Sequence, residues 1–201
     1  IFLAVLGGIT WMGVPGALVG PVLVAAFLAL FTIYREDFLG IFKKELGLKD
    51  KFVITYVCAH GVANHLIQLV DAAEYLRDTN VVFQLIGSGM QKEMLQNEVV
   101  KRGLQEQVIF RDPVSKREVF KYILSSDMGA SVLKRVDTFK TIYSNKTFDY
   151  MSCKKPILLA IEGISKELIK DANCGICVEP ENAKDISDKI KEAINSENMF
   201  D

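Results

Sequence analysis

The sequence predicts an α/β fold, a Rossmann-like doubly wound parallel sheet that is preceded by a hydrophobic helix. Three observations predict it. Short runs rich in β-branched residues, such as Phe52–Val57 and Val81–Ile86, alternate with longer segments whose apolar residues recur at helical spacing. Short loops join these segments, which favours right-handed βαβ units and a parallel sheet. Finally, residues 1–34 contain no charged side chain, whereas charges occur every few residues from Arg35 onward.

The uncharged N-terminal part of the chain contains a candidate membrane helix. Gly16–Tyr34 approaches the ~20 apolar residues that a helix needs to cross a hydrocarbon core of ~30 Å. Arg35, Lys43 and Lys44 follow it, and the positive-inside rule then places the next domain in the cytoplasm. We therefore expect the protein at the cytoplasmic face of the inner membrane or in the cytoplasm. The alternative for this stretch is a buried helix of a soluble core.

Three parts are predicted along the chain: a hydrophobic segment over residues 1–35, a linker helix over 36–50, and an α/β domain over 51–201. The hydrophobic segment is expected to contact the membrane through residues 16–34. The stretch LGGITWMGVPGALVGPVLVAAFLAL resembles the last hydrophobic elements of autoinducer-2-exporter-like transporters. A genuine membrane anchor and a chimeric reading frame both remain open. The corresponding functional alternative is a transporter-like membrane protein with a cytoplasmic nucleotide-binding domain.

The elements of the α/β domain follow from the change of hydrophobic period along the chain. The predicted strands are 52–57, 81–86, 108–110, 128–133, 156–161 and 175–178. The predicted helices are 63–77, 90–102, 116–124, 145–153, 166–172 and 183–195. The first of these helices places Leu66, Leu69, Val70 and Leu76 on one apolar face. Gly103 stands where a glycine commonly ends a helix.

Composition excludes several functions. A formal net charge of -1 argues against nucleic acid as a partner, because binding phosphate backbones needs an excess of clustered Lys and Arg. Four cysteines at irregular spacing do not form a disulfide framework in a chain of 201 residues. Cys174 and Cys177 have no second pair beside them, so we expect neither a zinc site nor a redox motif.

Ligands of doubly wound sheets bind beyond the carboxyl ends of the strands. The loops in which function is expected are therefore 58–63, 87–89, 112–115, 134–146 and 162–165. Two of them contain glycines that would let the backbone approach a phosphate, Gly61 in the first and Gly87 with Gly89 in the second. A plain tight turn, or a glycine in an awkward backbone conformation, is the alternative at both places.

Two histidines lie in or beside the first loop, but no acidic partner is identifiable near them. We therefore expect His60 and His65 at the surface or at a helix start.

The start of the predicted helix 145–153 is the most informative stretch. Ser144 or Asn145 can cap the helix, which leaves backbone donors and Lys146 at its N-terminus. Asp149 lies one turn further, where its carboxylate could accept hydrogen bonds from a pair of hydroxyls. Together these groups suit a phosphate and a neighbouring ribose diol. The alternative is an ordinary capped helix with an acid near its start.

Taken together, the loops resemble the C-terminal domain of family 4 retaining glycosyltransferases of the GT-B fold, closest to those that build bacterial surface polysaccharides. The resemblance covers almost all of residues 50–195. It is carried, in family order, by YVCAHGVANHLIQLVDAAEYL, VVFQLIGSGMQKEML, VIFRDPVSKREVFKYI, SNKTFDYMSCKKPIL and CGICVEPENAKDI.

The resemblance implies a nucleotide-sugar as the donor and a role for each loop, with no cofactor, no metal and no catalytic residue identified in this half. Gly61, Gly87 and Gly89 would lie beside the donor diphosphate, together with Asn145 and Lys146. Pro113 and Val114 belong to the loop that would pair with the base through backbone groups, and Asp149 would bind the ribose hydroxyls.

The chain departs from the family pattern at three places. Asp149 stands where the family usually has Glu, the Arg and Lys of many relatives are missing from the first loop, and the first Glu of the paired-Glu motif, expected near Thr141, is not present. The resemblance also implies an N-terminal acceptor domain that these residues do not contain. We therefore expect weak donor binding and no turnover, with a Rossmann-like scaffold that binds no ligand as a further alternative.

Overall fold

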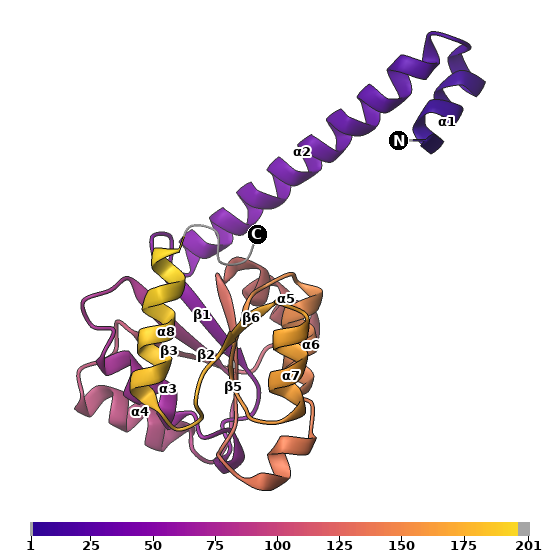
Figure 1. Cartoon of the computed structure of the whole chain (residues 1–201). Helices are drawn as coiled ribbons and strands as arrows, with labels where there is room; N and C mark the ends of the chain where they lie inside the picture. Colours follow the sequence, from indigo (N-terminus) through magenta and orange to yellow (C-terminus); the bar gives the residue numbers. More distant parts are fainter. Residues whose placement is uncertain (1, 197–201) are drawn as a thin grey trace. The chain divides into compact units, whose positions relative to one another are not determined.

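The computed structural model describes residues 2–196, except for the side chains of residues 4, 12, 31 and 34–37. The chain divides into two compact units, Ile1–Leu46 and Gly47–Asp201, which are described separately below (Figure 1).

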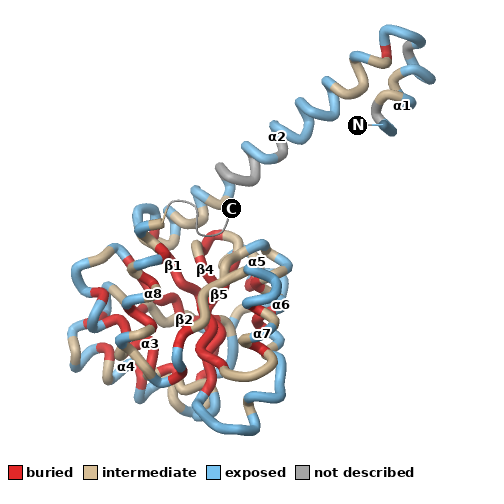
Figure 2. Tube along the Cα trace, in the orientation of Figure 1, coloured by how far each residue is buried: buried red, intermediate tan, exposed pale blue. Residues whose placement is uncertain are grey.

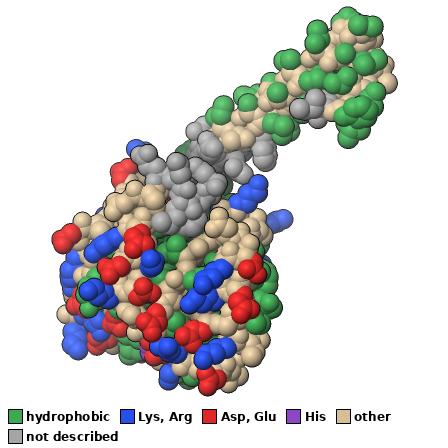
Figure 3. Space-filling model, viewed as in Figure 1, with side chains coloured by type: hydrophobic (Ala, Val, Ile, Leu, Met, Phe, Trp, Pro, Cys, Tyr) green, Lys and Arg blue, Asp and Glu red, His purple; other side chains and the backbone are tan. Residues whose placement is uncertain are grey.

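The first unit is a pair of helices, α1 (Phe2–Met12) and α2 (Gly16–Glu45). The two helices approach closely at Gly8, where an added Cβ would lie 1.9 Å from the Gly16 carbonyl oxygen. Apolar side chains cover much of this unit (Figure 3), and large ones such as Trp11 and Leu18 are more than three-quarters exposed. The pair therefore has a close backbone approach at Gly8, and many of its large apolar side chains are exposed.

The predicted transmembrane helix is not supported. No described helix reaches both the length and the apolar character that a bilayer crossing requires. The expected change of element at residue 35 is also absent, because α2 continues as one helix to Glu45. Residues 35–45 contain no proline, so nothing in the local sequence stops the helix where its polar residues begin.

The second unit is the predicted doubly wound sheet. Its six strands are all parallel and lie in the order β3-β2-β1-β4-β5-β6. The strand order reverses between β1 and β4, which is where such sheets bind ligands. The strands are β1 (Phe52–Val57), β2 (Val81–Ile86), β3 (Val108–Arg111), β4 (Met128–Val132), β5 (Ile157–Ala160) and β6 (Gly175–Cys177).

Helices cover both faces of this sheet, so β2, β4 and β5 are buried throughout and β1 is buried except at its two ends (Figure 2). Side chains from α3, α4 and α8 pack with one face, and side chains from α5, α6 and α7 pack with the other (Figure 1). The helical elements are η1 (Val62–Asn64), α3 (Ile67–Glu74), α4 (Lys92–Lys101), α5 (Lys116–Ser125), η2 (Asp137–Thr141), α6 (Asn145–Ser152), α7 (Ile164–Asp171) and α8 (Ala183–Asn195).

The structure divides one predicted element. The expected helix over residues 63–77 consists of the 3₁₀ turn η1 and the shorter helix α3, because His65 between them is left-handed with φ 46°. A continuous α-helix cannot include a residue in that conformation. The turn matters for function because it places Gly61 and Asn64 at the end of β1.

Candidate functional site

The loop after β1 packs directly against the loop after β2. The His60 amide donates to the Ser88 carbonyl over 2.8 Å, and the Gln91 amide donates to the His60 carbonyl over 3.0 Å. The carboxyl ends of the two strands therefore carry one joined backbone surface, adjacent to the point where the strand order reverses.

Gly87 and Gly89 have a structural reason to be glycine. Their φ angles are 149° and 157°, respectively. An added Cβ at Gly87 would lie 2.0 Å from the Cys58 carbonyl oxygen, and one at Gly89 would lie 2.5 Å from the His60 carbonyl oxygen. The Gly87 amide already donates to the Arg111 carbonyl over 3.2 Å. These glycines allow the two loops to pack, so their presence does not by itself mark a phosphate site.

Gly61 differs from them. Its backbone is ordinary extended chain, with φ −102° and ψ 167°, so an awkward conformation does not explain the glycine. An added Cβ would touch only the side-chain nitrogen of Asn64, at 3.9 Å. The fold therefore leaves open space beside Gly61, as a site for an approaching ligand would.

Lys146 is the most unusual charged group at this end of the sheet. Its side chain rises from the first turn of α6, and the residue is only 7% exposed. Its Nζ lies 3.4 Å from Asn64 Oδ1 and 5.1 Å from the centre of the Tyr56 ring. In the described part of the chain, no carboxylate lies within ion-pair distance of Nζ. Burial lowers the pKa of Lys146, and nearby Cys58 partly opposes this shift.

The start of α6 differs from the sequence prediction in its cap. Ser144 occupies the N-cap position, but no side-chain hydrogen bond caps the helix. Asn145 is exposed at the first helical position. The side-chain cap expected at Ser144 or Asn145 is therefore absent, and the first turn of α6 presents backbone donors beside Lys146.

Asp149 lies one turn further along α6, as expected, but it is not alone. Its Oδ2 pairs with Lys116 Nζ over 2.5 Å. Lys116 is the first residue of α5 and directly follows the loop that contains Pro113 and Val114. The sequence did not indicate this partner, because 33 residues separate the two.

Pro113 and Val114 line a pocket of about 270 Å³. The other lining residues come from the ends of β1 and β2, with one from α5: Val57, Cys58, Ala59, Ile86, Gly87, Ser88 and Val119. The pocket is slightly smaller than the ~300–1,000 Å³ common for small-molecule sites. It lies beside the joined loops and has mainly apolar walls, which suit one flat ring system.

His60 lies inside the site region rather than at the surface, so the expectation of a surface histidine was wrong. The residue is fully buried, and its ring centre lies 6.1 Å from those of Tyr56 and Phe110. Neither ring nitrogen has a hydrogen-bond partner among the described residues. Burial, with a smaller contribution from Lys92, lowers the pKa of His60 to about 4. His65 is partly exposed at the end of η1.

The predicted site residues therefore gather at one end of the sheet, through direct contacts between neighbouring loops. Gly61, Asn64 and Lys146 form one group, and Gly87 and Gly89 lie against residues 58–60. Asp149 contacts Lys116, which directly follows the loop that lines the pocket. Within residues 2–196 there is no cluster of His, Cys, Asp and Glu that could hold a metal ion.

A doubly wound parallel sheet with loops that meet beside a strand-order reversal defines a Rossmann-like domain. The chain belongs to the family of glycosyl transferases group 1, whose sequence model matches residues 40–200. It is 28% identical over 131 residues to an uncharacterised glycosyltransferase of Methanocaldococcus jannaschii. That alignment covers 65% of this chain and 35% of the relative.

Solved glycosyltransferase structures share the fold. The structure of HepE of Anabaena in complex with UDP has a TM-score of 0.71 at 17% identity, with 81% of this chain and 44% of that chain covered. The C-terminal domain of LpcC, a group 1 glycosyl transferase of Francisella tularensis, has a TM-score of 0.62 at 20% identity. The match covers 74% of this chain and 78% of the LpcC domain. The expected likeness to the C-terminal half of a GT-B enzyme is thus confirmed.

This chain spans less than half the length of the M. jannaschii relative and of HepE. The family model, the M. jannaschii relative and LpcC are named as glycosyltransferases, and they give no support to the alternative of a transporter-like membrane protein.

Proposed function

We propose that residues 47–196 bind the nucleoside diphosphate part of a nucleotide-sugar donor. The observation that carries this proposal is the buried Lys146, whose ammonium group contacts Asn64 and the Tyr56 ring but no carboxylate of the described residues. A buried cation is costly unless an anion or strong hydrogen bonds compensate it. The open side of Gly61 next to Asn64, and the first turn of α6, provide the space and the backbone donors for a diphosphate.

The remaining parts of a nucleotide fit the neighbouring groups. The apolar pocket at Pro113 and Val114 suits the base, whose edges would pair with the backbone of that loop. Asp149 contacts Lys116, the residue that directly follows the same loop. A ribose attached to a base in the pocket could therefore donate hydrogen bonds to the Asp149 carboxylate. The solved structures of HepE with UDP and with UDP-glucose support a uridine nucleotide as the first ligand to test.

We further propose that the donor serves a retaining transferase of surface-glycan synthesis. A structural neighbour, WaaG, is a glycosyltransferase involved in lipopolysaccharide biosynthesis; its TM-score is 0.65 at 17% identity. In a GT-B enzyme the acceptor is oriented by the opposite domain, and one domain alone neither excludes water nor positions an acceptor. The 201-residue chain tested alone is therefore expected to bind the donor weakly and to transfer no sugar.

Calorimetric titration of the full chain with UDP, GDP and UDP-glucose tests the proposal. Lys146→Met should weaken binding of the preferred nucleotide roughly 10- to 100-fold, as expected for a lost hydrogen bond to a charged group. Lys189→Met is the matched control, because Lys189 pairs with Glu192 on α8, away from the strand ends. Equal affinities of both variants and the unmodified chain, or no binding of any nucleotide, would contradict the proposal and favour a scaffold without a ligand.

A further inference from the structure

The Lys116–Asp149 pair connects the two walls of the candidate site. Lys116 directly follows the loop that lines the pocket, and Asp149 belongs to α6, whose first turn carries Lys146. Lys116 Nζ lies 2.5 Å from Asp149 Oδ2. This contact therefore ties the loop proposed for the base to the helix proposed for the diphosphate and ribose.

The start of α5 holds Lys116 in a defined place. Ser115 and Glu118 form a reciprocal capping box, in which each side chain accepts a hydrogen bond from the backbone of the other residue. The Lys116 ammonium also lies 5.4 Å from the centre of the Phe120 ring. The lysine is thus anchored at its backbone and at its tip, although its side chain is 66% exposed.

The pair uses only one side of the Asp149 carboxylate. Oδ2 accepts the hydrogen bond from Lys116, whereas Oδ1 accepts none from any residue in the described part of the chain. The Asp149 side chain is 26% exposed, so part of it can be reached from solvent. An ionised carboxylate accepts hydrogen bonds at both oxygens, and a carboxylate held through one oxygen presents the other in a fixed direction.

We propose that Lys116 is a positioning residue of the donor site, which holds Asp149 so that its free oxygen accepts a hydrogen bond from a ribose hydroxyl. This inference rests on the proposed function. It assigns to Lys116 a role in discriminating ribose from deoxyribose rather than in folding, because exposed ion pairs add little to stability.

The test compares the affinity of the full chain for UDP with its affinity for 2′-deoxy-UDP and 3′-deoxy-UDP; if the chain prefers guanine, GDP and its deoxy forms replace them. The unmodified chain should prefer the ribose form by about tenfold over at least one deoxy form. Lys116→Met should reduce this preference to about twofold, whereas Lys116→Arg, which keeps the charge and the donors, should preserve most of it. Lys121→Met, an exposed lysine on the same helix, should not change it.

A double-mutant cycle then distinguishes positioning from an independent contact. If Lys116 acts through Asp149, the double variant Lys116→Met/Asp149→Asn should show no lower preference than Asp149→Asn alone. An unchanged preference in Lys116→Met, alongside its loss in Asp149→Asn, would overturn the inference and leave donor binding intact. A higher affinity for UDP in Lys116→Met would also overturn it, because Lys116 would then compete with the ribose. No nucleotide binding by the unmodified chain would instead contradict the proposed function itself.

Discussion

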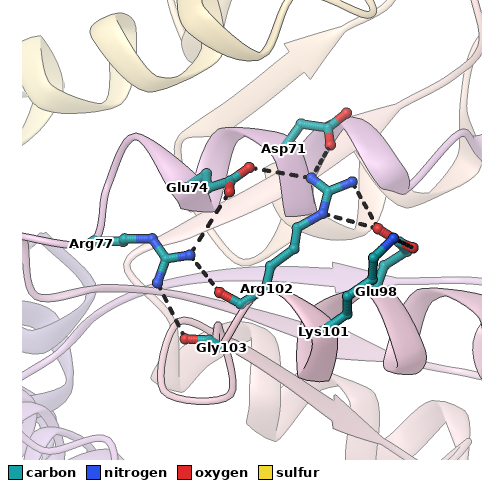
Figure 4. Close-up of polar contacts among 7 residues, drawn as sticks. All are labelled: Asp71, Glu74, Arg77, Glu98, Lys101, Arg102 and Gly103. Carbon is teal, nitrogen blue, oxygen red and sulfur yellow. Dashed lines mark hydrogen bonds and ion pairs between the residues drawn. The ribbon is translucent and has the colours of Figure 1, made fainter.

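Two cations of this domain, Arg102 and Lys146, have opposite surroundings. Arg102, at the end of α4, contacts three carboxylates, those of Asp71, Glu74 and Glu98, at 2.6–3.4 Å (Figure 4). The hydrogen bond that Arg102 donates to Asp71 makes the largest contribution to raising the pKa of Arg102. Lys146 is more deeply buried, contacts no carboxylate in the described chain, and has its pKa lowered by burial.

The difference separates a structural cation from one available for a ligand. The Arg102 cluster joins α3 to α4, and its positive charge is paired with carboxylates of the same chain. Arg77 beside it donates to the carbonyl oxygens of Arg102 and Gly103 (Figure 4). Lys146 contacts Asn64 and the Tyr56 ring but no carboxylate among the described residues, and it lies where the strand order reverses. A matched cluster contributes to folding, whereas an unmatched buried cation costs stability and gains its compensation from a bound anion.

The largest expected effect contrasts two glycines that the sequence alone could not tell apart. Gly87→Ala should lower the free energy of unfolding by about 3 kcal/mol, because the new Cβ would clash with the Cys58 carbonyl and the φ of 149° is unfavourable for alanine. Gly61→Ala should change it by less than about 0.5 kcal/mol, because its φ is ordinary and the space is open. Urea denaturation measures both.

Nucleotide titration completes this contrast. Gly61→Ala should weaken UDP binding if the open space beside Gly61 receives the diphosphate. A Gly61→Ala chain that is as unstable as Gly87→Ala would show instead that the first loop is also fixed by packing, and the distinction between the two glycines would fail.

The second prediction concerns His60, a buried side chain of the site region whose ring nitrogens have no hydrogen-bond partner among the described residues. The folded-state pKa of His60 is about 4, below the ~6.5 of an unfolded chain. The unfolded state therefore binds the proton first, and stability should fall as pH decreases from about 6.5 to 4, by about 2–3 kcal/mol in total. Above about pH 6.5 this contribution should be constant.

Denaturation curves across this pH range test the His60 prediction. His60→Phe fits an aromatic environment without titrating, so the pH-dependent loss should shrink in this variant. Identical pH profiles in the variant and the unmodified chain would mean that protonation of His60 does not oppose folding.

The sheet was predictable from sequence, and the site only in part. Alternating strand and helix periods identified every strand within a few residues, because burial on both faces imposes those periods. Periodicity does not extend into loops, so the sequence did not show that His60 is buried or that Gly87 packs on Cys58. The Lys116–Asp149 contact arises between α5 and α6, and no local pattern reports a pair that only the tertiary fold brings together.

The smallest expected effect tests the comparison of the two cations directly. Arg102→Met should lower the free energy of unfolding by about 1–2 kcal/mol, because three carboxylates lose a shared partner and then repel one another. Lys146→Met should leave it unchanged or raise it by about 1 kcal/mol, since an apolar side chain replaces a buried charge that lacks a carboxylate. The effects on UDP binding should be reversed, with loss in Lys146→Met and none in Arg102→Met. If both variants lost stability and neither lost binding, Lys146 would be a structural cation like Arg102, because an ammonium group that serves folding alone has no reason to respond to an anion.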